Sequence, residues 1–280
     1  MRSTSISRAL ALASALALGG CTNVFFQPSR DLYYRGDLPG MEMREVRFKS
    51  ADGTQLTGAF FPAKGAPKGT VIQFHGNAQN MTAHFLYAYW LVKAGYNLFV
   101  FDYRGYGASE GKVSLPGAVE DGEAALRAVR TIPEVDPDRI VVLGQSLGAA
   151  LAVASLAQAR VPGVRAVILE SPFASYRAMA RSVLSRFWLT WPFQWPISGL
   201  VSARYEPYRF AAKLPAVPVL VIHGDADPVV PYSQGKALFD AIAPPKDFWT
   251  ISGGGHLEAF TRFGKEYCPK LLQFLDKALR

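Results

Sequence analysis

Hydrophobic positions change their spacing along this chain of 280 residues, and the change separates two kinds of predicted structure. Two early segments alternate apolar and polar side chains or are rich in strand-forming residues; they are Arg44–Lys49 and Gln55–Phe61. The turn Asp52-Gly53 lies between them. This pattern predicts an antiparallel hairpin at the start of the folded part.

From residue 71 onward, short apolar runs alternate with longer segments of helical spacing. The predicted strands are 71–74, 97–101, 139–143, 164–169, 217–222 and 248–251, and the predicted helices are 80–94, 117–131, 147–159, 232–243 and 258–279. Such alternation is typical of βαβ units around a parallel sheet. Together with the hairpin it predicts an α/β fold with a mostly parallel, eight-stranded sheet and helices on both faces.

One interval, about residues 173–214, breaks this alternation. It contains the aromatic segment 187–196, which holds three of the five tryptophans. Long connections in compact domains are usually functional, so we expect a helical lid insertion here. The tryptophans could form an acyl-chain pocket, enter a membrane interface or pack a lid helix onto the core, and the sequence leaves these alternatives open.

The beginning of the chain resembles a signal peptide, because Arg2 and Arg8 precede an uncharged run, 9–20, that is mostly Ala and Leu. As a helix this run would be about 18 Å long, too short for a hydrocarbon core of about 30 Å. We therefore expect a signal peptide at 1–20, a tether at 21–43 and a single domain at 44–280. The formal charge of +8 comes from dispersed Lys and Arg residues, which predicts a solvated surface rather than a nucleic-acid site.

Leu18-Gly19-Gly20-Cys21 resembles the lipobox of bacterial lipoproteins, and the resemblance implies that Cys21 is lipidated. Thr22 replaces the aspartate that retains such proteins at the inner membrane, which favours a periplasm-facing position at the outer membrane. The alternative is ordinary cleavage nearby that leaves Cys21 free. Cys268 is the only other cysteine, so lipidation would leave it without a disulfide partner, and we expect it to be buried in the last helix.

Gly144-Gln145-Ser146-Leu147-Gly148 stands between a predicted strand and a predicted helix, which is the arrangement of a nucleophile elbow. A tight turn of this kind needs small flanking residues and holds the serine hydroxyl at the head of the helix. The backbone N–H of Leu147 and the helix dipole can stabilise an oxyanion there. We predict that Ser146 is a nucleophile.

A serine nucleophile needs a histidine base, and the chain has four histidines. His256 follows the last predicted strand and three glycines, so its loop can bring the imidazole over the elbow, and we favour it. His75 would lie beside the oxyanion site and His223 ends a strand. His84 lies in a predicted helix and is interpreted as a surface or hydrogen-bonded histidine.

The carboxylate that orients the base should follow a strand located between the serine and the histidine. We favour Asp227, which precedes Pro228 where the chain turns into a helix. Asp225 is interpreted as stiffening the same loop. Glu170 remains the alternative, because an acid one strand earlier could also reach the imidazole.

Residues 44–280 resemble the α/β-hydrolase family, with the motifs in its order Ser, Asp, His. His75-Gly76-Asn77-Ala78 looks like the oxyanion loop of the family. The resemblance implies that the N–H of Asn77 acts with that of Leu147, although Ala78 stays open as the second donor. It also implies a structural role for Asp102, Arg104 and Ser109 in a loop similar to the one after the family's fourth strand.

The motif at residues 75–78, the loop beginning at Asp102 and Glu170-Ser171-Pro172-Phe173 look most like the branch of protein depalmitoylases and lysophospholipid lipases. The resemblance implies a serine hydrolase of carboxylic esters or thioesters, acting on a small-molecule or lipid-like acyl substrate. No metal or organic cofactor is implied, because a neighbouring base activates the nucleophile. The alternatives are a serine peptidase on the same fold and a catalytically silent envelope lipoprotein that acts as a scaffold.

Overall fold

A computed structural model describes residues 25–34 and 41–280 of the chain. The predicted signal peptide and Cys21 lie outside the described residues. Eight strands form one sheet in the order β10-β9-β8-β7-β4-β6-β3-β2. They are β2 (Arg44–Lys49), β3 (Gln55–Phe61), β4 (Thr70–Phe74), β6 (Asn97–Phe101), β7 (Ile140–Gln145), β8 (Val164–Glu170), β9 (Val219–Gly224) and β10 (Lys246–Ile251).

The predicted α/β fold with a mostly parallel, eight-stranded sheet is confirmed. Strands β4 and β6 to β10 are parallel to their neighbours within that group, whereas β3 pairs antiparallel with both β2 and β6. The predicted hairpin is β2 and β3, with Lys49 opposite Gln55 next to the turn. A separate pair of two-residue strands, β1 (Gln27–Pro28) and β5 (Ala78–Gln79), is parallel.

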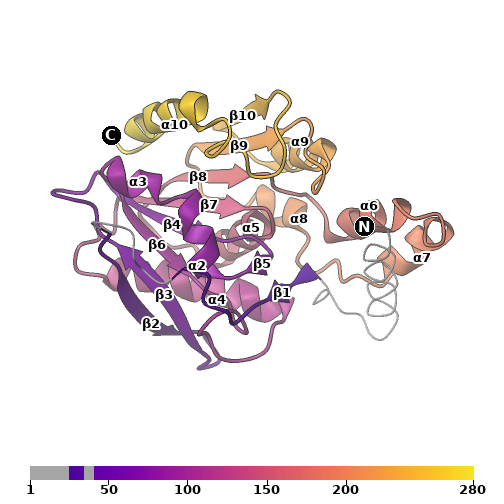
Figure 1. Cartoon of the computed structure of the whole chain (residues 1–280), viewed down its shortest axis with the longest axis horizontal. Helices are drawn as coiled ribbons and strands as arrows, with labels where there is room; N and C mark the ends of the chain where they lie inside the picture. Colours follow the sequence, from indigo (N-terminus) through magenta and orange to yellow (C-terminus); the bar gives the residue numbers. More distant parts are fainter. Residues whose placement is uncertain (1–24, 35–40) are drawn as a thin grey trace.

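Helices cover both faces of the sheet (Figure 1). The α-helices are α2 (Met81–His84), α3 (Trp90–Lys93), α4 (Leu115–Ala128), α5 (Leu147–Ala159), α6 (Tyr176–Ser185), α7 (Gln194–Gly199), α8 (Pro207–Ala211), α9 (Tyr232–Ala241) and α10 (Gly264–Ala278), and the 3₁₀ turns are η2 (Phe85–Tyr87), η3 (Val129–Thr131) and η4 (Trp191–Phe193). Side chains of α4, α5 and α9 pack into the core on one face. Those of α2, α3 and α10 pack into the core on the other.

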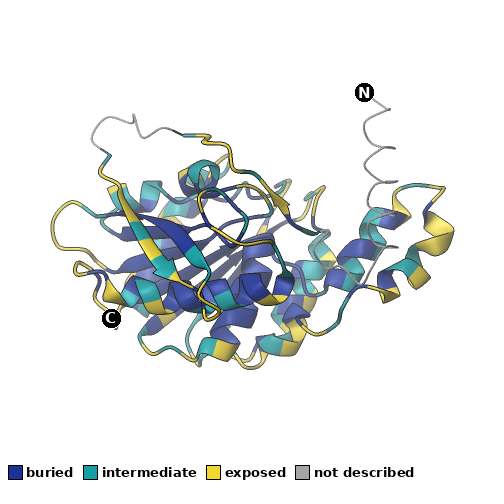
Figure 2. Cartoon of the chain, turned by 90° about the horizontal axis from the view of Figure 1, so that it is seen from below, coloured by how far each residue is buried: buried dark blue, intermediate teal, exposed yellow. Residues whose placement is uncertain are grey.

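Alternate residues of each central strand face opposite layers, as the period of a strand requires. Ile72 belongs to the layer under α4 and α5, and Val71 belongs to the layer under α10. The strands are apolar throughout because both faces are covered. Figure 2 shows this buried sheet between partly exposed helices.

Two of the predicted helices are shorter than expected. The segment predicted as one helix at 80–94 is broken into α2, η2 and α3. Its aromatic residues have only moderate helix propensity, and stacking of Phe85 on Phe61, with ring centroids 5.0 Å apart, favours the tighter 3₁₀ turn. The last helix begins at Gly264 rather than 258, because the Glu258 carboxylate accepts a hydrogen bond from the N–H of Gly255 in a preceding turn.

The segment 173–214, called the lid below, contains α6, η4, α7 and α8. Helices α6 and α7 project beyond the carboxyl ends of the strands (Figure 1). Residues 25–34 of the predicted tether lie against the domain: Phe26 is buried, and the ring of Phe25 packs on Tyr176 of α6 with centroids 5.3 Å apart. Within residues 25–34 and 41–280, no helix has the length and apolar character needed to cross a membrane.

Candidate active site

Ser146 occupies a strained turn between β7 and α5. Its backbone has φ 54° and ψ −119°, a conformation that non-glycine residues rarely adopt. Both flanking glycines are sterically required, because a Cβ at Gly144 would lie 2.6 Å from the Cα of Ala149, and one at Gly148 would collide with the carbonyl oxygen of Phe74. The close approach of α5 to the sheet therefore determines the strand-turn-helix geometry that the glycine spacing predicts.

The end of β8 holds both the serine turn and the histidine loop. The carbonyl oxygen of Glu170 accepts a hydrogen bond from the N–H of Ser146 at 2.9 Å, and the hydroxyl of Ser171 accepts one from the N–H of Leu257 at 3.4 Å. Ser146, Ser171 and Leu257 are three of the five non-glycine residues with positive φ in the described chain. Backbone strain of this kind clusters at functional sites, where the surrounding structure enforces it.

His256 and Asp227 are in direct contact. The distance from Nδ1 of His256 to Oδ2 of Asp227 is 2.8 Å. The side chain of Asp227 is completely buried, whereas the imidazole keeps 19% of its side-chain surface accessible. This contact fixes the ring through Nδ1 and leaves Nε2 as the nitrogen that can exchange a proton with a substrate or a nucleophile.

Asp227 is held as a carboxylate by three close donors, including His256, and by the more distant His223, whose Nε2 lies closer to the carbonyl oxygen of Val230. Its Oδ1 accepts hydrogen bonds from the N–H groups of Val229 and Val230, at 2.8 and 2.9 Å, and Nε2 of His223 lies 3.5 Å from Oδ2. Burial alone would raise the pKa of Asp227. The hydrogen bonds from His223 and His256 outweigh burial and hold this pKa well below its ordinary value.

The two other candidate acids have different partners. Asp225 accepts a hydrogen bond from the N–H of Gly253 at 2.7 Å, which ties the loop after β9 to the loop before His256. Glu170 is buried and accepts hydrogen bonds from Nε2 of Gln145 and from the N–H of Ala259. Burial raises the pKa of Glu170. Among the three candidate acids, the structure brings Asp227 to the imidazole.

The loop after β4 is fixed on several sides. The carbonyl oxygen of Asn77 accepts a hydrogen bond from the Tyr106 hydroxyl at 2.6 Å, and the Asn77 side chain accepts one from the N–H of Gln27 at 2.8 Å. These contacts hold the backbone whose N–H is a candidate oxyanion donor. Leu147 is the first residue of α5, where N–H groups have no partner within the helix.

His84 supports the same loop, which the sequence did not indicate. Its Nε2 lies 2.9 Å from the carbonyl oxygen of Ala78, and the ring is buried against Gly76. Burial, with electrostatic interaction with the His75 ring as a smaller cause, lowers the pKa of His84 to about 3. A neutral imidazole that donates from Nε2 therefore holds the loop in place.

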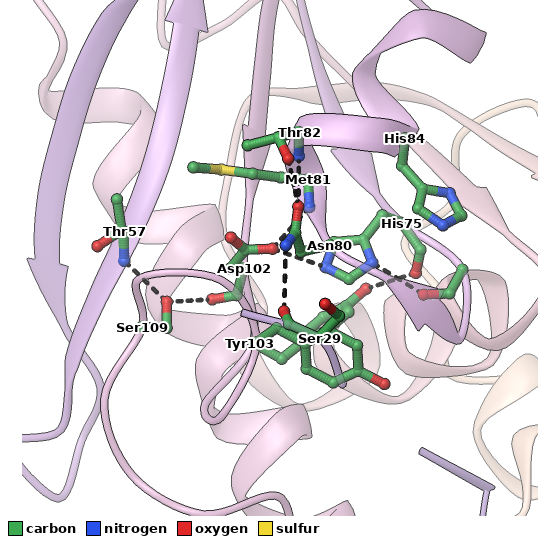
Figure 3. Close-up of polar contacts among 12 residues, drawn as sticks. Ser29, Thr57, His75, Asn80, Met81, Thr82, His84, Asp102, Tyr103 and Ser109 are labelled. Carbon is green, nitrogen blue, oxygen red and sulfur yellow. Dashed lines mark hydrogen bonds and ion pairs between the residues drawn. The ribbon is translucent and has the colours of Figure 1, made fainter. Parts of the chain in front are cut away.

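The loop beginning at Asp102 contacts His75, α2 and β3 (Figure 3). Oδ1 of Asp102 accepts a hydrogen bond from the N–H of Met81 at 2.7 Å and lies 3.3 Å from Nε2 of His75. The hydroxyl of Ser109 donates to the carbonyl oxygen of Asp102 and accepts from the N–H of Thr57. These contacts join β3, α2 and the loop after β6, and they involve none of Ser146, Asp227 and His256.

Arg104 binds this loop to α4. Its Nε and Nη2 contact the carboxylate of Asp121, at 2.8 to 3.1 Å, while Nη1 contacts Asp52 at 2.8 Å. Asp121 is completely buried. The arginine therefore neutralises a buried carboxylate and joins the hairpin turn to the body of the domain, a role in structure rather than in chemistry.

Cys268 is half-buried in α10. Burial, with the charge of Glu170 as a further cause, raises the pKa of its thiol to about 11. The thiol is therefore neutral and weakly reactive at ordinary pH. Within the described chain, no three His, Cys, Asp or Glu side chains are grouped so as to hold a metal ion.

Comparison with known proteins agrees with this geometry. The family model described as "Serine aminopeptidase, S33" (Hydrolase_4) matches residues 65–212, which is more than half of the chain. The chain belongs to this family. Its sheet order and its serine turn are those of the α/β-hydrolase superfamily, so it is an α/β hydrolase by fold as well as by family.

Two relatives match most of the length of this α/β hydrolase. The protein YfhR of Escherichia coli (strain K12) is 36% identical over 263 residues, covering 92% of this chain and 88% of YfhR. The α/β-hydrolase domain-containing protein WAV2 of Arabidopsis thaliana is 33% identical over 252 residues, covering 83% of this chain and 78% of WAV2.

Solved structures with the same fold include two esterases. The Pyrococcus furiosus esterase Pf2001 superposes with a TM-score of 0.73 at 22% identity, covering 91% of this chain and 98% of that protein. Acetyl xylan esterase 1 from Thermoanaerobacterium sp. gives a TM-score of 0.67 at 21% identity, covering 98% of this chain and 93% of that protein. At this identity the likeness concerns the fold of this α/β hydrolase.

Proposed function

We propose that this α/β hydrolase is a serine hydrolase that cleaves carboxylic esters or thioesters through an acyl-enzyme intermediate. Oγ of Ser146 attacks the acyl carbon while Nε2 of His256 takes the proton. Asp227 keeps the imidazole in the required tautomer and stabilises its positive charge. The N–H groups of Leu147 and Asn77 bind the oxyanion.

The same groups complete the cycle. The tetrahedral intermediate collapses, the bond from the acyl carbon to the leaving oxygen or sulfur breaks, and the His256 imidazolium gives its proton to the departing alcohol or thiol. A water molecule then attacks the acyl-Ser146 ester, with His256 again accepting the proton. The carboxylic acid leaves and the Ser146 hydroxyl is restored.

The observation that carries this proposal is the convergence at the end of β8. The carbonyl oxygen of Glu170 accepts a hydrogen bond from the N–H of Ser146, and the Ser171 hydroxyl accepts one from the N–H of Leu257. Leu257 directly follows His256, whose ring contacts Asp227. The strained backbone at Ser146, Ser171 and Leu257 supports a catalytic role, because strain of this kind clusters at functional sites. A silent scaffold would need none of these features.

Esters or thioesters are favoured as the substrate class by two observations. Pf2001 and acetyl xylan esterase 1, which share the fold, are named as esterases. The motifs around His75, Asp102 and Glu170 resemble those of enzymes that act on lipid-like acyl groups. The second candidate is peptide hydrolysis, because the description of the matching family names a serine aminopeptidase.

Labelling with a fluorophosphonate probe tests the nucleophile. We expect the wild-type chain to be labelled and Ser146→Ala to be unlabelled. Ser233→Ala, which changes an exposed serine of α9, serves as the matched control and should be labelled like the wild type. Absence of labelling in the wild type, or labelling that survives in Ser146→Ala, would overturn the proposal.

Substrate class is tested with p-nitrophenyl esters of increasing chain length, an acyl thioester, a lysophospholipid and a peptide amide. The proposal expects turnover of esters or thioesters that exceeds turnover of the amide, and Ser146→Ala removes it. Faster hydrolysis of the amide would favour the peptidase candidate. If the fluorophosphonate probe labels the protein but none of these substrates is hydrolysed, the natural substrate carries another acyl group.

The beginning of the chain supports a second part of the proposal, which concerns location. Residues 1–20 and Cys21 have the pattern of a lipoprotein signal, so we propose that the mature protein faces the periplasm from the outer membrane through an acylated Cys21. Growth of an expressing bacterium with an alkynyl fatty acid should label the wild type. Cys21→Ser should abolish this label, whereas Cys268→Ser should not.

A further inference from the structure

The lid exposes an unusually dense group of large apolar side chains. Trp188 and Trp195 are 81% and 67% accessible, and Leu189, Trp191 and Phe193 are also exposed. We call these five residues the aromatic face. Their segment lies at the end of the molecule formed by α6 and α7, where Figure 2 shows exposed surface. Large apolar side chains exposed together along one segment mark a candidate interaction surface.

The backbone beneath the aromatic face is ordered by hydrogen bonds. The N–H of Trp191 donates to the carbonyl oxygen of Phe187 at 2.8 Å, and the Thr190 hydroxyl donates to that of Leu184 at 2.6 Å. Met179 and Leu184 of α6, the helix that precedes this segment, are buried in the core. The exposed rings are therefore presented outward from a fixed support, and exposure is not the result of an unpacked loop.

The lid is also strongly basic. Residues 173–214 include five Arg and one Lys but only one acidic residue, Glu206, which is buried. Every ion pair in the described chain is made by basic residues outside the lid. The guanidinium of Arg181 lies 4.6 Å from the ring centroid of Trp195. Arg181 and the ring of Trp195 therefore share one surface, and no ion pair within the described residues neutralises Arg181 or Arg186.

We infer that the aromatic face, with the adjacent Arg181 and Arg186, binds the headgroup region of an anionic lipid bilayer. Tryptophan rings are favoured at that depth, and nearby arginines are attracted to anionic headgroups. A second copy of this chain is a poorer occupant, because it would bring two basic lids together.

The position of the N-terminal segment agrees with this occupant. Phe25 packs on Tyr176 of α6, so the chain enters the domain beside the lid. Cys21 is four residues earlier, and four extended residues reach at most about 14 Å. The acyl group proposed for Cys21 would consequently enter a bilayer close to the lid, and both attachments would use one membrane surface.

Quenching of tryptophan fluorescence by brominated lipid tests the inference with the full chain. The three exposed lid tryptophans are the main reporters, because Trp90 and Trp249 are partly buried against the core. Cys21→Ser is used throughout, so that acylation does not contribute. We expect strong quenching in vesicles that contain brominated phosphatidylglycerol, weak quenching with brominated phosphatidylcholine alone, and a decrease at high salt.

The informative variant is Arg181→Glu/Arg186→Glu, because it keeps all three reporters and should lose most of the quenching. Lys49→Glu/Lys112→Glu reverses two exposed charges outside the lid, and it should be quenched like the parent protein. Equal quenching of both variants, or of the parent in neutral and anionic vesicles, would overturn the inference. A second result would also overturn it. Sedimentation would show a dimer without lipid, Trp188→Ala/Trp191→Ala would dissociate that dimer, and lipid would cause no quenching.

Fluorophosphonate labelling of each variant is measured in parallel. It reports whether Ser146 remains in a folded site and does not depend on lipid. Loss of quenching with labelling retained supports the lid as the membrane surface. If the wild type is not labelled at all, the proposed catalytic function fails while the quenching result still decides the membrane inference.

Discussion

The carboxylate of Glu170 accepts a hydrogen bond from the backbone N–H of Ala259 at 3.2 Å, although the two residues are 89 positions apart. The other carboxylate oxygen accepts a hydrogen bond from Nε2 of Gln145 at 2.7 Å. Gln145 is adjacent to Ser146, and Ala259 is three residues after His256. Glu170 thus connects the strand that ends at the proposed nucleophile with the loop that carries the proposed base.

Replacing Glu170 with Ala should lower activity through geometry. The change leaves two buried donors without an acceptor, which costs about 1 to 3 kcal/mol of unfolding free energy for each. Because the side-chain link between the serine and histidine segments is lost, while the backbone carbonyl of residue 170 and the Ser171 hydroxyl keep their contacts, we expect kcat to fall by about 10- to 100-fold with little change in KM. Glu170→Gln keeps one acceptor oxygen and should be intermediate. Steady-state kinetics on a p-nitrophenyl ester measure both parameters.

Glu206 offers a matched control, because it is also a buried carboxylate that accepts two backbone hydrogen bonds, from Tyr176 and Arg177. Glu206→Ala should destabilise the lid to a similar degree and leave kcat close to that of the wild type. If the two variants lose stability and kcat in equal proportion, Glu170 has no special positioning role.

Asp227→Asn should impair the chemical step while preserving the fold. An amide can present its NH₂ group to Nδ1 of His256, which favours the wrong tautomer, and it cannot stabilise the imidazolium. We expect kcat to fall by about 10²- to 10⁴-fold with KM nearly unchanged. The measurement is kcat and KM on the best ester, together with the thermal unfolding midpoint.

Asp225→Asn is the corresponding control on the same loop. Asp225 accepts its hydrogen bond from Gly253 and does not contact the imidazole. This variant should therefore retain most of its kcat. A loss of kcat as large as that of Asp227→Asn would contradict the assignment of the orienting carboxylate to Asp227.

The sheet was predictable because parallel strands covered on both faces are continuous apolar runs. Each predicted run from 71 to 251 corresponds to a strand of the structure, with ends displaced by about two residues at most. The prediction of a single helix at 80–94 was wrong. The stacking of Phe85 on Phe61, which favours the 3₁₀ turn, is a contact between distant parts of the chain. A local pattern carries no information about such contacts.

The elbow at Ser146 was predictable because steric limits fix the glycine spacing locally. The role of Glu170 was not, since it depends on β8 lying between β7 and β9 and on which side chain faces the loop after β10. The contact of His84 with Ala78 was not predictable for a different reason, because it depends on how the turn between β4 and α2 folds and buries the ring against Gly76. Glu170 and His84 each form a hydrogen bond to another segment of the chain. The residues around them in the sequence contain no motif that indicates these contacts.

Arg104→Met should destabilise the domain without changing its chemistry. The buried carboxylate of Asp121 would lose its counter-charge, which costs about 3 to 5 kcal/mol. The double variant Arg104→Met/Asp121→Asn removes the uncompensated charge and should recover part of this loss. Urea unfolding measures the free energies, and kcat of the folded fraction should stay near the wild-type value. A large fall in kcat with stability unchanged would instead place Arg104 in the catalytic machinery.

His84 should make the protein less stable as the pH falls. Its Nδ1 is buried without a hydrogen-bond partner, so the folded state has no acceptor for a second proton. The ring centroids of His75 and Tyr87 lie 5.3 and 5.7 Å from that of His84, and a charge on His75 would oppose this protonation further. Burial of Glu170 acts in the opposite direction, because a raised carboxyl pKa favours the folded state on acidification.

The pKa of His84 is about 3 in the folded protein, whereas the ordinary pKa of a histidine is 6.5, so the unfolded chain binds the extra proton first. Between these values the unfolding free energy should fall by up to about 1.4 kcal/mol per pH unit. His84→Gln can still donate to the carbonyl oxygen of Ala78 but does not titrate. We expect urea unfolding at pH 7, 5.5 and 4 to show a flatter pH dependence for His84→Gln than for the wild type. Parallel curves for the two proteins would show that His84 is not the group responsible for acid sensitivity.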